Sequence, residues 1–164
     1  MNRQILLPYY PYGLRSICLK KPSESFLIKE LNEAYYEALD WWERPFQIPY
    51  HSPQFRIVLH ALEDISRPLK VNNREVVASD VICRIVWENT QALKDESDPS
   101  WIVETVVNYF NNASFCPFPR DIMNQLYYLL HALHFDLSGF IGRNEAVRAS
   151  KLKVDPYEFD KIVL

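Results

Sequence analysis

The chain has 164 residues, of which 48% are hydrophobic and 24% charged, and its formal net charge is -3. This composition predicts one globular domain of ordinary size and excludes a disordered, collagen-like or low-complexity chain. Only three glycines are present, and neither GxGxxG nor GxxxxGK[ST] occurs. A Rossmann or P-loop nucleotide site is therefore not expected.

The three cysteines are far apart and form no CxxC motif. This pattern is typical of reduced thiols in a cytoplasmic protein. The N-terminus has no basic-then-apolar signal sequence, and no apolar run is long enough to span a bilayer. We therefore expect a cytoplasmic protein without membrane association.

The N-terminal residues 1–22 are predicted to form an extended arm. Pro8 and Pro11 flank two tyrosines, and proline is incompatible with a helix interior because it lacks an N–H and fixes φ. The arm either packs on its own domain or inserts into a groove of a partner, and the sequence leaves both alternatives open.

A first helix is predicted from about Ser25 to Trp42. Apolar residues recur there with helical spacing, and acidic residues line the opposite side. The apolar positions are Leu27, Leu31, Ala34, Ala38 and Trp41. A second helix is predicted from Pro53 to Arg67, since Ser52 is a suitable N-cap and Pro68 ends the pattern.

Residues 69–78 are ambiguous. A small hairpin around Asn72-Asn73 is one alternative, and a turn leading directly into a helix is the one we favour. Further helices are predicted over Asp80–Leu93, from Asp98-Pro99 to about Asn112, and over Arg120–Leu137. A short helix over Asn144–Ser150 and a last turn within 155–164 complete the prediction.

The predicted fold is therefore an all-α, compact single-domain bundle of about five main helices. The arm occupies residues 1–22, the bundle residues 23–141, and a basic C-terminal segment residues 142–164. This last segment either packs on the bundle or extends from it.

The sequence gives little support for catalytic groups. His60, His131 and His134 lie at helical spacings from each other or from carboxylates, but the patterns HExxH and ExxH are absent. Cys116 precedes two histidines, yet a free cysteine is usually a small buried hydrophobe. We expect no metal, no cofactor and no catalytic residues, with a metal-dependent enzyme using a histidine–carboxylate site as the third alternative.

The function favoured by the sequence is a non-enzymatic interaction module, an adaptor or a small subunit of a larger assembly. The chain has more aromatic side chains than one small core can bury, and aromatic side chains dominate binding hot spots. The partner is expected to be a protein or a second copy of the chain. The predicted partner-binding residues are Tyr9, Tyr10, Tyr12, Trp41, Trp42, Glu30, Glu33 and Glu37.

A nucleic-acid accessory protein is the second alternative. Basic residues gather near both ends of the chain and could follow a phosphate backbone. The candidates are Arg3, Arg15, Lys20, Lys21, Arg143, Arg148, Lys151 and Lys153.

Overall fold

The computed structural model describes residues 3–90, 98–112 and 115–157. It divides into two compact units. Residues 3–61 and 131–157 form the sheet unit, and the described residues between 62 and 130 form the helical unit. Strands and helices are both abundant, so the chain is mixed α/β and the prediction of an all-α bundle is wrong.

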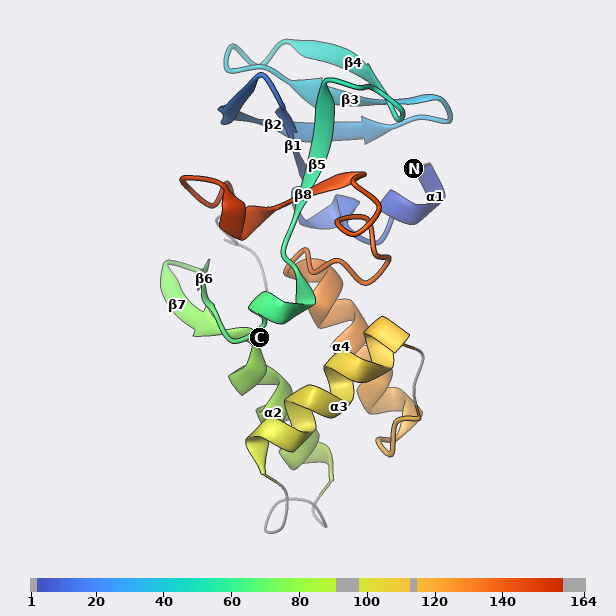
Figure 1. Cartoon of the computed structure of the whole chain (residues 1–164), viewed down its shortest axis with the longest axis vertical. Coiled ribbons are helices and arrows are strands. Elements are labelled where there is room, and N and C mark those ends of the chain that lie inside the picture. Colours follow the sequence, from blue (N-terminus) through green and yellow to red (C-terminus); the bar gives the residue numbers. More distant parts are fainter. Residues whose placement is uncertain (1–2, 91–97, 113–114, 158–164) are drawn as a thin grey trace. The chain divides into compact units, whose positions relative to one another are not determined.

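The sheet unit contains a six-stranded mixed sheet (Figure 1). Its strand order is β4-β3-β2-β1-β5-β8, and neighbouring strands are antiparallel except β5 and β8, which are parallel. The strands are β1 (Arg15–Cys18), β2 (Lys21–Leu31), β3 (Tyr35–Leu39), β4 (Pro45–Pro49), β5 (Phe55–Leu59) and β8 (Ala146–Arg148).

The predicted extended arm is instead α1 (Arg3–Leu6), the 3₁₀ turn η1 (Tyr10–Tyr12) and β1. Pro11 is compatible with η1 because it sits in the first turn, where an N–H has no helical partner in any case. Leu6, Tyr9 and Leu14 are fully buried in the core of the sheet unit. The beginning of the chain therefore folds onto its own core.

The predicted first helix over residues 25–42 is wrong, because this segment forms β2 and β3. Phe26 and Ile28 are buried while Leu27 and Lys29, which alternate with them, are exposed, and this is the period of a strand. The second predicted helix, over residues 53–67, is also wrong. It is replaced by β5, which lies between β1 and β8, and by the 3₁₀ turn η2 (Leu62–Asp64).

The outer edge of β4 is protected by its prolines. The N–H of Asp40 donates to the carbonyl of Arg44 at 3.0 Å, so the backbone of Arg44 points toward β3, and so does that of every second residue after it. The backbones of Pro45 and Pro49 therefore point away from β3, to the outer edge, where proline offers no N–H. Strand addition at this edge is therefore disfavoured.

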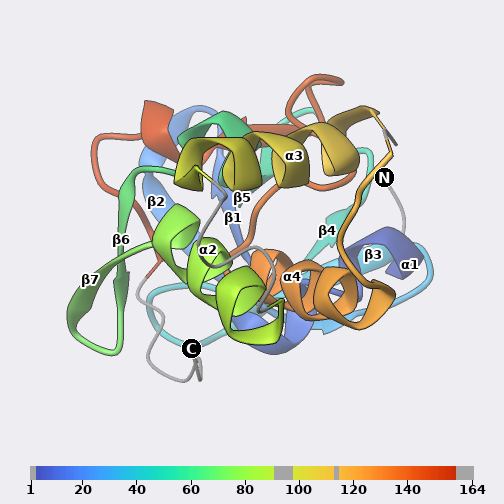
Figure 2. The same ribbon diagram turned by 90° about the horizontal axis from the view of Figure 1, so that it is seen from below.

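In its described residues, the helical unit contains a hairpin and three α-helices (Figure 2). Asn72 and Asn73 both have positive φ (50° and 60°), so the two-residue turn closes β6 on β7. The turn that we favoured for residues 69–78 is therefore wrong, and the hairpin alternative is right. The elements are β6 (Pro68–Val71), β7 (Arg74–Val77), α2 (Ala78–Asn89), α3 (Pro99–Asn112) and α4 (Arg120–Ala132).

The three long helices agree with prediction except near their ends. Asp98 accepts a hydrogen bond from the backbone N–H of Ser100 at 2.9 Å, which confirms the predicted start of α3. This hydrogen bond lowers the pKa of Asp98. The α4 helix ends before Leu137, because His134 adopts a left-handed φ of 55°. The predicted end of α2 at Leu93 lies outside the described residues.

The predicted short helix over residues 144–150 is not found. Residues 144–150 contain β8 and the start of the 3₁₀ turn η4 (Ala149–Lys151) instead of a short helix. In the predicted final turn over 155–164, residues 155–157 are irregular, and residues 158–164 lie outside the described part. Among the described residues, no helix has both the length and the apolar character needed to cross a membrane.

Candidate functional site

Five aromatic rings at one end of the sheet form a continuous cluster. Phe26 of β2 lies 5.3 Å from Phe46 of β4 and 6.0 Å from Phe55 of β5, measured between ring centroids. Trp41 lies 6.5 Å from Phe26, and Trp42 lies 4.9 Å from Trp41. We call these five residues the aromatic cluster. It connects the core of the sheet unit with the turn between β3 and β4.

The two tryptophans are the exposed part of this cluster. Phe26 is 7% exposed, whereas Trp41 and Trp42 are 58% and 63% exposed. Both tryptophans lie in the turn of residues 40–44, which we call the hairpin tip. Leu39 pairs with Leu27, so this turn is level with the first half of β2. Large exposed aromatic surface of this kind marks interaction sites more often than single exposed apolar residues do.

The hairpin tip is held by Asp40. One carboxylate oxygen of Asp40 accepts hydrogen bonds from the backbone N–H groups of Trp42 and Arg44, each at 2.9 Å. The other forms an ion pair with the Arg44 guanidinium at 2.8 Å, and that guanidinium lies 4.7 Å from the centre of a Trp42 ring. Desolvation acts to raise the pKa of Asp40, but the hydrogen bonds from Arg44 and Trp42 outweigh it and lower that pKa. The tip is therefore a preorganised turn.

The three predicted tyrosines do not join the tryptophans in this cluster. Tyr9 is fully buried, and its hydroxyl accepts a hydrogen bond from the N–H of Leu137 at 3.2 Å. Tyr10 is half-buried and donates to the carbonyl of Lys29, and Tyr12 is exposed. Tyr9 therefore belongs to the core, where it has no surface to offer a partner.

The predicted acidic residues also lie elsewhere. Glu30 of β2 and Glu37 of β3 are directly paired across the two strands, and Glu33 is in the turn that joins them. In the register of β2 and β3 they are near the end opposite to the hairpin tip. The structure therefore does not combine these carboxylates with Trp41 and Trp42 in one site.

The predicted nucleic-acid residues are distributed over several elements of the sheet unit. Arg3 is on α1, Arg15 on β1, and Lys20 and Lys21 are at the turn between β1 and β2. Several bind groups of the chain itself: Arg15 donates to Ser25, Lys21 pairs with Glu24, Arg143 with Glu145, and Arg148 donates to Ser150. The remaining C-terminal candidates, Lys151 and Lys153, are exposed.

The three histidines named by the sequence are buried in the sheet unit. His134 lies 4.2 Å from Tyr157 between ring centroids, and His131 lies 4.6 Å from Tyr9. Burial and the charge of His60 lower the pKa of His134 to about 3, so its ring is neutral at neutral pH. In the described residues, no group of three or more histidine, cysteine or acidic side chains is arranged to hold a metal ion.

Two of the cysteines are unsuited to nucleophilic chemistry at neutral pH. Burial raises the pKa of Cys83, with nearby Asp80 and Asp98 adding to the effect, and burial also raises the pKa of Cys116. A reactive thiol needs the opposite shift, because the thiolate is the nucleophile. The sulfur of Cys116 instead lies 3.3 Å from that of Met123.

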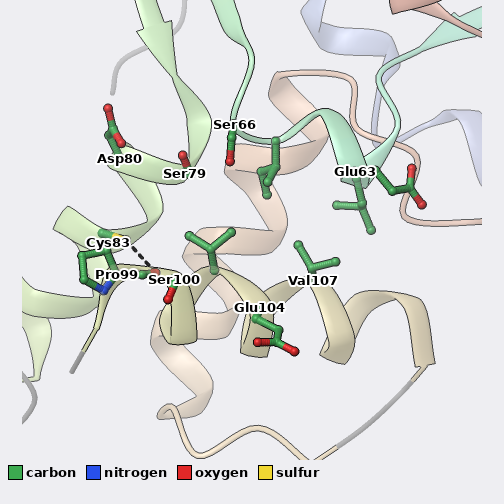
Figure 3. A pocket seen from close by; sticks show the side chains of 12 residues that line it. Glu63, Ser66, Ser79, Asp80, Cys83, Pro99, Ser100, Glu104 and Val107 are labelled. Atoms are coloured by element: carbon green, nitrogen blue, oxygen red, sulfur yellow. Dashed lines mark hydrogen bonds between the residues drawn. The ribbon is translucent and has the colours of Figure 1, made fainter.

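The helical unit contains a groove of about 420 Å³ between η2, α2 and α3 (Figure 3). Its apolar lining is contributed by Leu62 and Ile65, by Cys83 of α2, and by Val103 and Val107 of α3. The acidic side chains that line it are Glu63, Asp80 and Glu104, which Figure 3 shows on different sides of the groove.

Sequence reasoning missed the phenylalanines of the aromatic cluster and the whole groove. The alternation of Phe26 and Ile28 was a usable signal for β2 and hence for the cluster. The groove had no such signal, because its lining comes from three separated segments that only helix packing brings together.

Comparison with known proteins assigns no relative: no protein-family model, no curated protein and no solved structure matches the chain.

Proposed function

We propose that the protein is a non-enzymatic interaction module that inserts its hairpin tip into an apolar pocket of a partner protein. The observation that carries this proposal is the exposure of Trp41 and Trp42 on a turn that Asp40 holds rigid. Tryptophan is enriched in binding hot spots, where one residue can contribute about 2 kcal/mol or more.

The geometry of the tip supports binding in two ways. Phe26 lies against Trp41 and is itself packed on Phe46, so Trp41 is supported from within the sheet. The hydrogen bonds of Asp40 restrict the turn before any partner arrives. Less conformational entropy is then lost on association, which favours affinity.

The charges at this end of the sheet favour a protein over a polyanion. The β1–β2 turn with the beginning of β2, and the β3–β4 turn, carry three cations, Lys20, Lys21 and Arg44, and three carboxylates, Glu24, Asp40 and Glu43. Two of the cations are already in ion pairs, Lys21 with Glu24 and Arg44 with Asp40. These two turns together carry no net charge, so they have little long-range attraction for phosphate groups. Nucleic-acid binding through the basic termini stays the alternative, and titration with short RNA and DNA at low salt tests it.

Replacing Trp41 and Trp42 together with alanine is expected to weaken partner binding about 100-fold or more, because two hot-spot rings are lost. The protein serves as bait in its native extract, and its own self-association is measured by sedimentation velocity. The recovered partner, or the second copy, is then titrated against the wild type and the variant. Trp42→Ala alone is measured as well, in case the double variant does not fold. Trp42 is the more exposed of the two tryptophans, so this single change disturbs the fold least.

Tyr128→Ala is the matched control, because Tyr128 on α4 is 65% exposed but lies in the helical unit. It should bind like the wild type. A monomeric protein that captures no partner would refute the proposal, and so would a partner that binds the double variant as well as the wild type.

A further inference from the structure

The groove of the helical unit has the size of a site that could hold side chains of another molecule. Its volume of about 420 Å³ falls within the roughly 300–1,000 Å³ of typical ligand sites. Val103 and Val107 are one turn apart on α3 and half-buried, so one face of this helix remains partly open toward the groove. On the side of α2, Ser79 and Cys83 line the groove.

The charge around this apolar lining has one sign. Glu63 comes from η2, Asp80 from α2 and Glu104 from α3, and all three are exposed. Among the described residues, no lysine, arginine or histidine lines the groove, and no ion pair involving these three carboxylates is found. Such a rim attracts a cationic ligand and repels nucleic acid and anionic lipid.

The lining elements also restrict the conformation of a bound peptide. Within the part of the chain that the structure describes, the groove is bordered by two helices and a 3₁₀ turn, and no strand contributes to its lining. An extended peptide would find no strand edge to satisfy its backbone hydrogen bonds. A helix satisfies its own backbone and presents apolar side chains at i, i+3, i+4 and i+7.

We propose that this groove binds a basic amphipathic helix of a partner protein. Aliphatic side chains on one face of that helix contact Val103 and Val107, and lysine or arginine residues beside that face pair with Glu63, Asp80 and Glu104. This site uses none of the residues of the hairpin tip, so it stands independently of the function proposed above.

The test uses the full chain and three synthetic peptides with the same apolar face. Their other positions carry lysine, glutamine or glutamate, and binding is measured by fluorescence anisotropy and mapped by NMR chemical shifts. We expect the lysine peptide to bind about tenfold more tightly than the glutamine peptide, and the glutamate peptide to bind least. The preference should shrink as salt is added, and the shifts should centre on α2 and α3.

Two sets of variants separate the apolar from the charged contribution. Val103→Glu is expected to abolish binding of both the lysine and the glutamine peptides. Because Val103 is half-buried and its replacement could impair folding, the triple variant Glu63→Gln, Asp80→Asn and Glu104→Gln is examined too, in which all changes are at exposed positions. It should lower the affinity for the lysine peptide to that for the glutamine peptide.

Glu88→Gln is the matched control, since Glu88 is an exposed carboxylate of α2 that does not line the groove. It should leave the preference for the lysine peptide unchanged. Absence of binding by all three peptides overturns the proposal, as does equal binding of the three. Chemical shifts confined to residues outside the groove overturn it as well.

Discussion

Replacing Tyr9 with alanine is expected to lower the free energy of unfolding by about 3–5 kcal/mol, the usual cost of removing a buried aromatic ring. Tyr9 is fully buried, its ring lies 4.6 Å from that of His131, and its hydroxyl accepts a hydrogen bond from the Leu137 N–H. Urea unfolding followed by circular dichroism measures the change.

Tyr9→Phe is the control that keeps the ring and removes only the hydroxyl, and it should cost about 1–2 kcal/mol because the Leu137 N–H loses its acceptor. A loss below about 1 kcal/mol for Tyr9→Ala would show that the beginning of the chain does not fold onto the core. Tyr9 would then return to the set of partner-binding candidates.

The stability of the protein is expected to fall as the pH drops below about 6.5. The pKa of His134 is about 3 in the folded chain, because burial and the charge of His60 disfavour the protonated ring, and about 6.5 in the unfolded chain. Between these values the unfolded state binds more protons, so protonation favours unfolding. This single group should cost about 2 kcal/mol between pH 7.5 and pH 5.

His134→Asn is expected to remove this part of the pH dependence. Asparagine has no titrating group and tolerates the left-handed φ of 55° at this position. The free energy of unfolding is measured from urea curves at pH 7.5 and pH 5, and His51→Asn, at an exposed histidine, serves as the control. An unchanged pH dependence in His134→Asn would mean that His134 is not the buried neutral ring described here.

The helices of the second half of the chain were predictable because the sequence signals that define them act between residues close together in the sequence. Asp98-Pro99 marks the beginning of α3 by capping and by the fixed φ of proline, and both act within one turn. Likewise α2 and α4 have strong apolar periodicity over more than two turns. Only their ends depended on more distant structure, as the left-handed His134 after α4 illustrates.

The sheet was missed because residues far apart in the sequence determine it. Leu27, Leu31 and Ala38 have the spacing of a helical face, and leucine and alanine are good helix formers. Pairing of β2 with both β1 and β3 overrides that preference, and Leu27 is exposed while Leu31 and Ala38 are buried. Likewise Ile57-Val58-Leu59 is a short apolar run that periodicity cannot assign to a helix or a central strand.

The candidate sites were predictable only in part. The sequence pointed to Trp41 and Trp42 as partner-binding candidates, and the structure places both at the surface. It could not separate them from Tyr9, because burial depends on the tertiary fold. The role of these tryptophans in binding stays a prediction.

Hydrogen–deuterium exchange on the complex of the protein with its captured partner, or with its second copy, tests the proposed docking most directly. We expect slower exchange on binding in the turn of residues 40–44 and at the beginning of β4, with little change at β2 residues near Glu30. Protection confined to other segments, with residues 40–44 exchanging as in the free protein, would contradict docking through Trp41 and Trp42.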